Sequence, residues 1–163
     1  MGPEAASSRY AGAMATLTEL REGSLAALEA LYRDAPMGPR PTGLFRGQAL
    51  ARVDGPLARS ARGAAILAPF AHLPFGIDFA SATWFFVGPW LRMGRFRIDR
   101  GRSRWRDAEV LRLEYDVSRL PRPVRGMLYD ELKPLDATLC LGLGGINAVD
   151  GDVFFFALHA WAG

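Results

Sequence analysis

The clearest regularity in the chain is a series of short apolar or alternating runs in its last third, separated by polar turns. Three such runs lie between Met127 and Trp161, divided by turn signals at 135–138 and 149–152. The last run, Val153 to Leu158, is apolar at every position, so both of its faces must be buried against other parts of the protein. A strand of this kind lies inside a sandwich or a closed barrel, or under a helix.

Four earlier runs also have the composition of strands: 42–53, 79–90, 91–99 and 109–117. In the fourth, apolar residues from Leu111 to Val117 alternate with charged ones, the pattern of a half-buried antiparallel strand. The sequence therefore predicts about seven strands. Tight turns join most of them, and successive strands with short links pair antiparallel.

Two segments are predicted to form the principal helices, and residues 124–127 can add one helical turn. From Ala13 to Tyr32 the apolar residues fall on one face, and Thr16 with Glu19 forms a capping-box pattern. Gly23 can divide this segment, with Ser24 capping its second half. A second, alanine-rich helix is expected at 57–67, after the first strand.

These elements predict an α+β chain that is mainly β. Near-continuous apolar strands favour a curved antiparallel sheet or a lipocalin-like barrel, because closure removes exposed edges. Residues 1–12 are small and polar, and we expect them to be disordered. Residues 13–163 are expected to form a single domain, since no linker or repeat divides them.

Composition adds limits on the class of protein. Half of the 163 residues are apolar and 23% are charged, as in soluble globular proteins, so a cytoplasmic location is expected. Asp78 and several prolines interrupt the apolar stretch between Arg62 and Arg92, which predicts no membrane span. Cys140 is the only cysteine, so no disulfide forms within the chain, and a small buried side chain is expected there. The sequence indicates no oligomeric state.

Two motifs carry a resemblance to a known family. Residues 43–47 read Gly-Leu-Phe-Arg-Gly, a Gly-x-aromatic-x-Gly signature with Phe45 in the place of a tryptophan. Residues 127–142 resemble an acidic segment, turn and strand near the end of the same proteins. Over about residues 30–158 the chain resembles the GXWXG-type domain proteins, small bacterial β-rich proteins. The resemblance implies a calycin-like or lipocalin-like curved sheet and no particular reaction.

Large aromatic side chains on the predicted strands suggest a binding function. Inside a barrel they would line a pocket for a small apolar molecule, or they would simply fill the core. The candidate ligand-binding residues are Trp84, Phe86, Trp90, Tyr115, Tyr129 and His159.

The sequence identifies no catalytic residue, and we expect a non-catalytic protein. His72 and His159 are the only histidines, and no pair of His or Cys has metal-ligand spacing. Two alternatives stay open: an acid–base enzyme with its site inside the barrel, and a haem protein with His159 as iron ligand. Asp130 and Glu131 are adjacent on a strand and must point to opposite faces, so they form no carboxylate pair, and solvated positions are expected for both.

Two further motifs allow more than one interpretation. The glycines of 142–145 precede no helix, which favours a bulge or a close backbone approach over a phosphate-binding loop. An arginine-rich hairpin around residue 100 is an alternative site for anions or nucleic acid, although nearby acidic residues partly neutralise it. Its candidate anion-binding residues are Arg100, Arg102 and Arg104.

Overall fold

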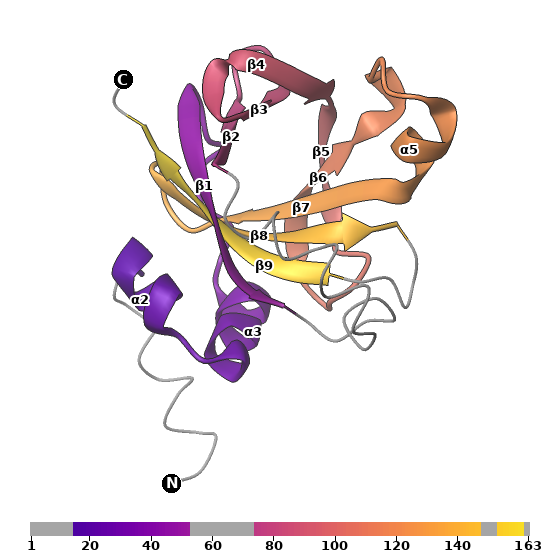
Figure 1. Cartoon of the computed structure of the whole chain (residues 1–163). Coiled ribbons are helices and arrows are strands. Elements are labelled where there is room, and N and C mark those ends of the chain that lie inside the picture. Colours follow the sequence, from indigo (N-terminus) through magenta and orange to yellow (C-terminus); the bar gives the residue numbers. More distant parts are fainter. Residues whose placement is uncertain (1–14, 53–73, 148–152, 162–163) are drawn as a thin grey trace, which may run out of the picture.

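The described part of the chain forms an antiparallel barrel-like sheet, and the two helices of residues 17–34 pack outside it (Figure 1). A computed structural model describes residues 15–52, 74–147 and 153–161. The helices and the 3-10 turn are α2 (Leu17–Glu22), α3 (Leu25–Asp34), η2 (Tyr115–Val117) and α5 (Arg122–Met127). The strands are β1 (Leu44–Arg52), β2 (Phe75–Asp78), β3 (Thr83–Phe86), β4 (Gly88–Arg95), β5 (Arg97–Arg102), β6 (Glu109–Glu114), β7 (Leu128–Pro134), β8 (Leu139–Ile146) and β9 (Val153–Ala160).

The nine strands form one sheet in the order β4-β3-β2-β1-β9-β8-β7-β6-β5. Apart from β4 and β5, strands that are consecutive in the chain pair with each other. β9 returns to pair with β1, where Gly47 lies opposite Leu158. The two edge strands, β4 and β5, are consecutive in the chain and are separated by Phe96 alone. One bent stretch of chain thus supplies both edges, which makes the barrel nearly closed. The last strand thus lies beside the first.

The helices begin where the sequence predicts. The Glu19 amide donates to Thr16 Oγ1 at 3.2 Å and the Glu19 carboxylate accepts from the Thr16 amide at 2.7 Å, which completes a capping box. Ser24 Oγ accepts from the Ala27 amide at 3.2 Å and starts α3. The predicted division at Gly23 is confirmed. The helix predicted at 57–67, the disordered segment predicted at 1–12 and His72 lie outside the described residues.

Two separate cores lie on the two faces of the sheet. Outside the barrel, Leu28, Leu31 and Tyr32 of α3 pack with Phe155 and Ala157 of β9. Inside it, Phe156 and Leu158 of the same strand pack with residues of the other strands. Both faces of β9 are therefore covered, as its uninterrupted apolar run predicts. Each such side chain stabilises the fold by roughly 1.5–3 kcal/mol when fully buried.

The prediction of a single strand over 79–90 is wrong, and so is the predicted number of about seven strands. Ala82 and Val87 adopt φ angles of 51° and 67°, and these left-handed conformations end one strand and begin another. The aromatic run is therefore divided between β3 and β4, and β2 begins earlier, at Phe75. β2 is therefore one of the two strands beyond the predicted number. The other arises at Phe96, where the predicted strand 91–99 bends into β5.

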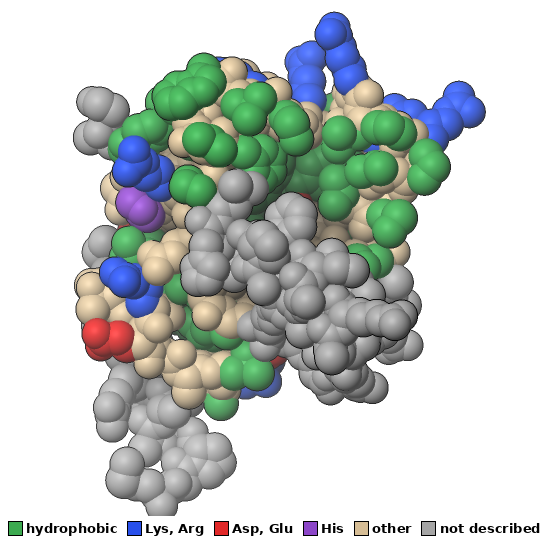
Figure 2. All heavy atoms as spheres, viewed as in Figure 1, with side chains coloured by type: hydrophobic (Ala, Val, Ile, Leu, Met, Phe, Trp, Pro, Cys, Tyr) green, Lys and Arg blue, Asp and Glu red, His purple; other side chains and the backbone are tan. Residues whose placement is uncertain are grey.

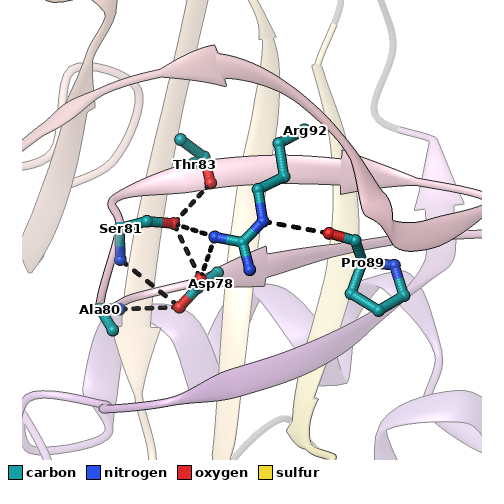
Figure 3. Close-up of polar contacts among 6 residues, drawn as sticks. All are labelled: Asp78, Ala80, Ser81, Thr83, Pro89 and Arg92. Carbon is teal, nitrogen blue, oxygen red and sulfur yellow. Dashed lines mark hydrogen bonds and ion pairs between the residues drawn. The ribbon is translucent and has the colours of Figure 1, made fainter.

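A carboxylate, rather than Gly or Pro, holds the β2–β3 turn (Figure 3). Asp78 Oδ1 accepts from the amides of Ala80 and Ser81 at 3.0 and 3.4 Å, and Oδ2 accepts from Ser81 Oγ at 2.8 Å. Arg92 of β4 joins this cluster through a 2.5 Å ion pair with Asp78. Burial opposes ionisation of Asp78, but the bonds from Ser81 and Ala80 and the charge of Arg92 together lower its pKa. Asp78, the charge that interrupts the apolar stretch between Arg62 and Arg92, is thus a structural part of the turn.

The described helices are short, and none of them is long and apolar enough to cross a bilayer.

Candidate functional site

The interior of the barrel is packed on one side and hollow on the other. Phe45, Ile77, Leu132 and Cys140 fill the packed part, and each is fully buried. The buried Cys140 confirms the role predicted for it, and burial raises the pKa of its thiol. The remaining part holds a cavity of about 290 Å³, lined by Phe75, Trp84, Phe86, Met93, Gly94, Tyr115, Leu120, Val124, Leu128, Asp130, Phe154 and Phe156.

Aromatic rings form much of the cavity wall. The ring centroids of Trp84 and Phe156 are 5.8 Å apart, and Phe75 lies 5.8 Å from Trp84 and 6.0 Å from Phe156. These tilted and edge-to-face arrangements are the ones that aromatic pairs prefer. The three rings thus form one continuous apolar surface.

The cavity opens to solvent on the side of β4, α5 and the start of β7. Four of its lining side chains are more than one-third exposed: Met93, Val124, Leu128 and Phe154. Figure 2 shows hydrophobic side chains gathered around a hollow in the upper part of the view. A solvent-accessible apolar mouth of this kind gives an apolar molecule a route into the barrel.

One polar chain interrupts the apolar lining. The indole Nε1 of Trp84 donates to the Tyr115 hydroxyl at 2.5 Å, and that hydroxyl donates to Oδ2 of Asp130. Burial raises the pKa of Asp130 to about 7, and the charge of Glu131 adds to this while the Tyr115 bond opposes it. Burial and the neighbouring Asp130 raise the pKa of Tyr115 well above its ordinary value, so the phenol stays a proton donor.

Two glycines on β8 make room for this site. A Cβ on Gly144 would lie 2.2 Å from Asp130 Oδ1, and one on Gly142 would lie 2.2 Å from the Phe156 ring. Strand pairing sets Asp130 opposite Gly144. The close approach to the backbone predicted for the glycines of 142–145 is confirmed at Gly142 and Gly144. The glycines leave space for the cavity's carboxylate and for one of its aromatic walls.

The alternation of β7 separates Asp130 from its neighbours. Leu128 and Asp130 point into the cavity, whereas Tyr129 and Glu131 point to the outer face of the sheet. The predicted opposite orientation of Asp130 and Glu131 is confirmed. The predicted solvated position of Glu131 is wrong, because α3 and residues 103–109 cover the outer face of β7. Asp130 is half-buried in the cavity wall. Glu131 is fully buried and accepts a 3.0 Å hydrogen bond from Tyr32.

The predicted ligand-binding residues are divided between different surfaces. Trp84, Phe86 and Tyr115 line the cavity. Trp90 is 79% exposed, and Tyr129 packs against Trp105 outside the barrel.

His159 shares its face of β9 with Phe155 and Ala157, which is the outer face. It does not line the cavity, and its direction does not favour the haem hypothesis, which stays a prediction. The acid–base alternative depends on Tyr115, Asp116 and Tyr129, and these side chains do not converge. Tyr115 lines the cavity, Tyr129 lies outside the barrel, and Asp116 is exposed and forms an ion pair with Arg97.

The predicted anion-binding arginines are engaged within the chain. Arg100 makes two hydrogen bonds of 2.8 and 2.9 Å to Glu109, and Arg102 forms an ion pair with Asp107. The Arg104 guanidinium lies 4.3 Å from the centre of the Tyr129 ring. Anion binding at this hairpin stays a prediction, and two of its charges are already matched by carboxylates.

Asp130 is the functional candidate that the sequence did not identify. Its position on a strand between Leu128 and Leu132 places it on an inward face, and that alternation was the available signal. Among the described residues, no group of three His, Cys, Asp or Glu side chains is placed to hold a metal ion.

Comparison with known proteins extends the description of the fold. No family model and no curated protein matches the sequence. The resemblance to GXWXG-type proteins therefore stays a prediction. A crystal structure of a protein from Thermomonospora curvata matches with 16% identity and a TM-score of 0.53, over 96% of this chain and 99% of that one. At this identity the likeness concerns architecture alone, and the chain is thus a small barrel-like β protein whose fold recurs in another solved structure.

Proposed function

We propose that the protein binds a small, mainly apolar molecule in the barrel cavity and carries out no chemistry on it. The observation that carries this proposal is the cavity itself, about 290 Å³ of space bounded by aromatic and aliphatic side chains. That volume lies just below the roughly 300–1,000 Å³ typical of ligand pockets, so a small ligand is expected. A ligand of one or two fused rings, or a short alkyl chain, fits such a space.

The composition of the lining supports binding over catalysis. The described lining residues include no serine, threonine, cysteine or histidine, so the commonest nucleophiles and bases of enzymes are absent among them. The titratable pair, Tyr115 and Asp130, is bonded together and fixes one polar corner. A few polar groups in an apolar pocket are typical of sites that orient a ligand.

Binding of a neutral apolar dye tests the proposal. N-phenyl-1-naphthylamine fluoresces when it leaves water, and we expect one saturable site per chain. Leu128→Trp adds a large side chain at the mouth and is expected to weaken dye binding about tenfold or more, because the ring occupies the ligand's space. Leu128 is 38% exposed, so the larger side chain can be accommodated without unfolding.

Val117→Trp is the matched control. Val117 is 48% exposed and does not line the cavity, so this variant adds the same side chain elsewhere. It is expected to bind the dye as the original protein does. A failure of the original protein to bind dye, or equal binding by Leu128→Trp, contradicts the proposal. Mass spectrometry of an organic extract of the purified protein then identifies any molecule that it retains.

A further inference from the structure

Asp130 is the one charged side chain among the described residues that line the cavity. Its Oδ2 accepts the hydrogen bond from Tyr115. Its Oδ1 lies over Gly144, where the absence of a Cβ leaves the space that this oxygen occupies. Within the described part of the chain, no group donates a hydrogen bond to Oδ1. The carboxylate thus offers a free acceptor to whatever occupies the cavity.

The negative charge of Asp130 also has no cationic partner in the described ranges. The arginines there that form ion pairs do so with other carboxylates. Lys133 lies on the opposite face of β7 and donates to the Glu109 carbonyl at 3.0 Å. A carboxylate that is half-buried among apolar side chains, as Asp130 is, is destabilised unless a positive group or several donors accompany it. The Tyr115 hydroxyl supplies one donor and no charge.

The walls around this carboxylate suit a cation. Trp84 reaches Tyr115 through its indole nitrogen, and the Phe156 ring lies 5.8 Å from that indole. Aromatic faces attract ammonium groups, and the attraction is stronger when the site is shielded from water. An aromatic enclosure with a single carboxylate at its base is complementary to a positively charged group on an apolar body.

We infer that the cavity selects molecules in which an apolar ring or chain carries one protonated amine, with the ammonium group bound to Asp130. This inference rests on the proposed binding function and names the class of its ligand. The ammonium donates to Asp130 Oδ1, while the apolar body contacts Phe75, Phe86 and Phe156. A neutral alcohol would make the same apolar contacts without the charge pair, and a carboxylic acid would place like charges together.

Three probes with the same naphthyl body separate these cases. We use 1-naphthylmethylamine, 1-naphthylmethanol and 1-naphthoate as competitors of the neutral dye at pH 8. The amine is expected to displace the dye about tenfold more effectively than the alcohol, because a hydrogen bond between two charged groups is stronger than one from a neutral hydroxyl. The carboxylate is expected to compete least. In Asp130→Asn, which keeps the shape of the side chain, the preference for the amine is expected to disappear.

The pH dependence of the original protein gives a second measurement that needs no variant. Tyr115 is the other titratable group in the described lining, and Glu131 faces the opposite side of the strand. The pKa of Asp130 is raised to about 7, so its carboxyl takes up a proton between pH 8 and pH 5. The amine stays protonated throughout this range, so its advantage over the alcohol is expected to shrink as the pH falls.

The outcomes distinguish the two proposals. If the dye binds and the three probes compete equally at pH 8, the inference fails and the proposed function stands. If the preference for the amine persists in a folded Asp130→Asn variant, or does not change with pH, Asp130 is not the recognition group. If the dye and all three probes fail to bind, the proposed function itself fails.

Discussion

The hydroxyl of Tyr32 on α3 donates a 3.0 Å hydrogen bond to Oε2 of Glu131 on β7, joining two residues that are 99 positions apart. Ser103 Oγ donates to the same oxygen, and the Arg104 amide donates to Oε1, each at 2.5 Å. Three donors from two segments thus converge on one fully buried carboxylate. The helix layer, the loop after β5 and the barrel are held together at this point.

We expect substitutions at this contact to destabilise the fold. Tyr32→Phe is expected to lower the free energy of unfolding by about 1–2 kcal/mol, because Glu131 then loses one of its three donors. Glu131→Gln is expected to lower it by more, about 2–4 kcal/mol. The side-chain NH2 of glutamine is itself a donor, so it cannot accept the hydrogen bonds that the replaced carboxylate oxygen accepted. Urea unfolding monitored by circular dichroism measures both values. The double variant gives the coupling between the two side chains, and simple additivity would contradict a direct interaction.

Alkaline pH is expected to unfold the protein. Burial and the charge of Glu131 raise the pKa of Tyr32 above its ordinary value of 10.0, and burial with nearby carboxylates does the same for Tyr115 and Tyr129. The folded state therefore keeps these phenols protonated, while the unfolded chain ionises them above pH 10. Their contribution to stability is complete below pH 10 and is lost as the pH rises further.

Tyrosinate absorbance at 295 nm measures this transition. We expect these tyrosines to ionise together with the loss of circular dichroism, in one cooperative step above pH 10. Independent ionisation of the phenols in a chain that remains folded would contradict the burial described for them.

Asp130 is expected to destabilise the empty protein at neutral pH. Its pKa is about 7 in the folded state against an ordinary value of 3.8, so the folded state favours the protonated form. Its contribution is fully present below about pH 4 and is lost as the pH rises through 7. Relative to the original protein, Asp130→Asn should gain roughly 2–4 kcal/mol of stability between pH 4 and pH 8, from about 1.4 kcal/mol per unit of pKa shift.

Paired urea titrations of the two proteins at pH 4, 6 and 8 measure this difference. The gain should be smallest at pH 4 and largest at pH 8. A stability difference that is the same at all three values would show that Asp130 has an ordinary pKa in the folded protein.

Gly142→Ala is expected to destabilise the barrel. The added methyl group would lie 2.2 Å from the Phe156 ring, which is itself packed between Phe75 and Trp84. Overpacking of this kind costs about 1–3 kcal/mol. Gly126→Ala is the matched control, since a Cβ there meets nothing within 4 Å. Because Gly126 lies in α5, this change is expected to be neutral or to stabilise by up to about 1 kcal/mol. Equal effects in thermal unfolding would contradict the close packing of Gly142.

Local patterns in the sequence were sufficient for several parts of the fold. The capping box at Thr16, the second cap at Ser24 and the doubly covered strand β9 all follow from neighbouring residues. The turn that ends at Ala82 did not, because its backbone is held by the Asp78 side chain and by Arg92 from the next strand but one. No Gly or Pro marks that turn.

The candidate site was predictable only in part, for a different reason. Trp84 and Trp90 are equivalent in an alternating pattern, yet one lines the cavity and the other is 79% exposed. A sequence shows which side chains favour burial, but whether they fill the barrel depends on how all the strands pack together. The burial of Asp130 likewise depends on Tyr115 and Gly144, which lie on other elements.

The bend at Phe96 has a consequence for how a molecule enters the barrel. Because β4 and β5 are not hydrogen-bonded to each other, the line between them is a seam that ends where the two strands join. The segment from η2 to α5, which contributes Leu120 and Val124 to the cavity, follows directly after β6. Widening the seam separates no paired strands and breaks none of the sheet's main-chain hydrogen bonds. The barrel can therefore open by side-chain and loop displacement alone while its ladder of strands stays intact.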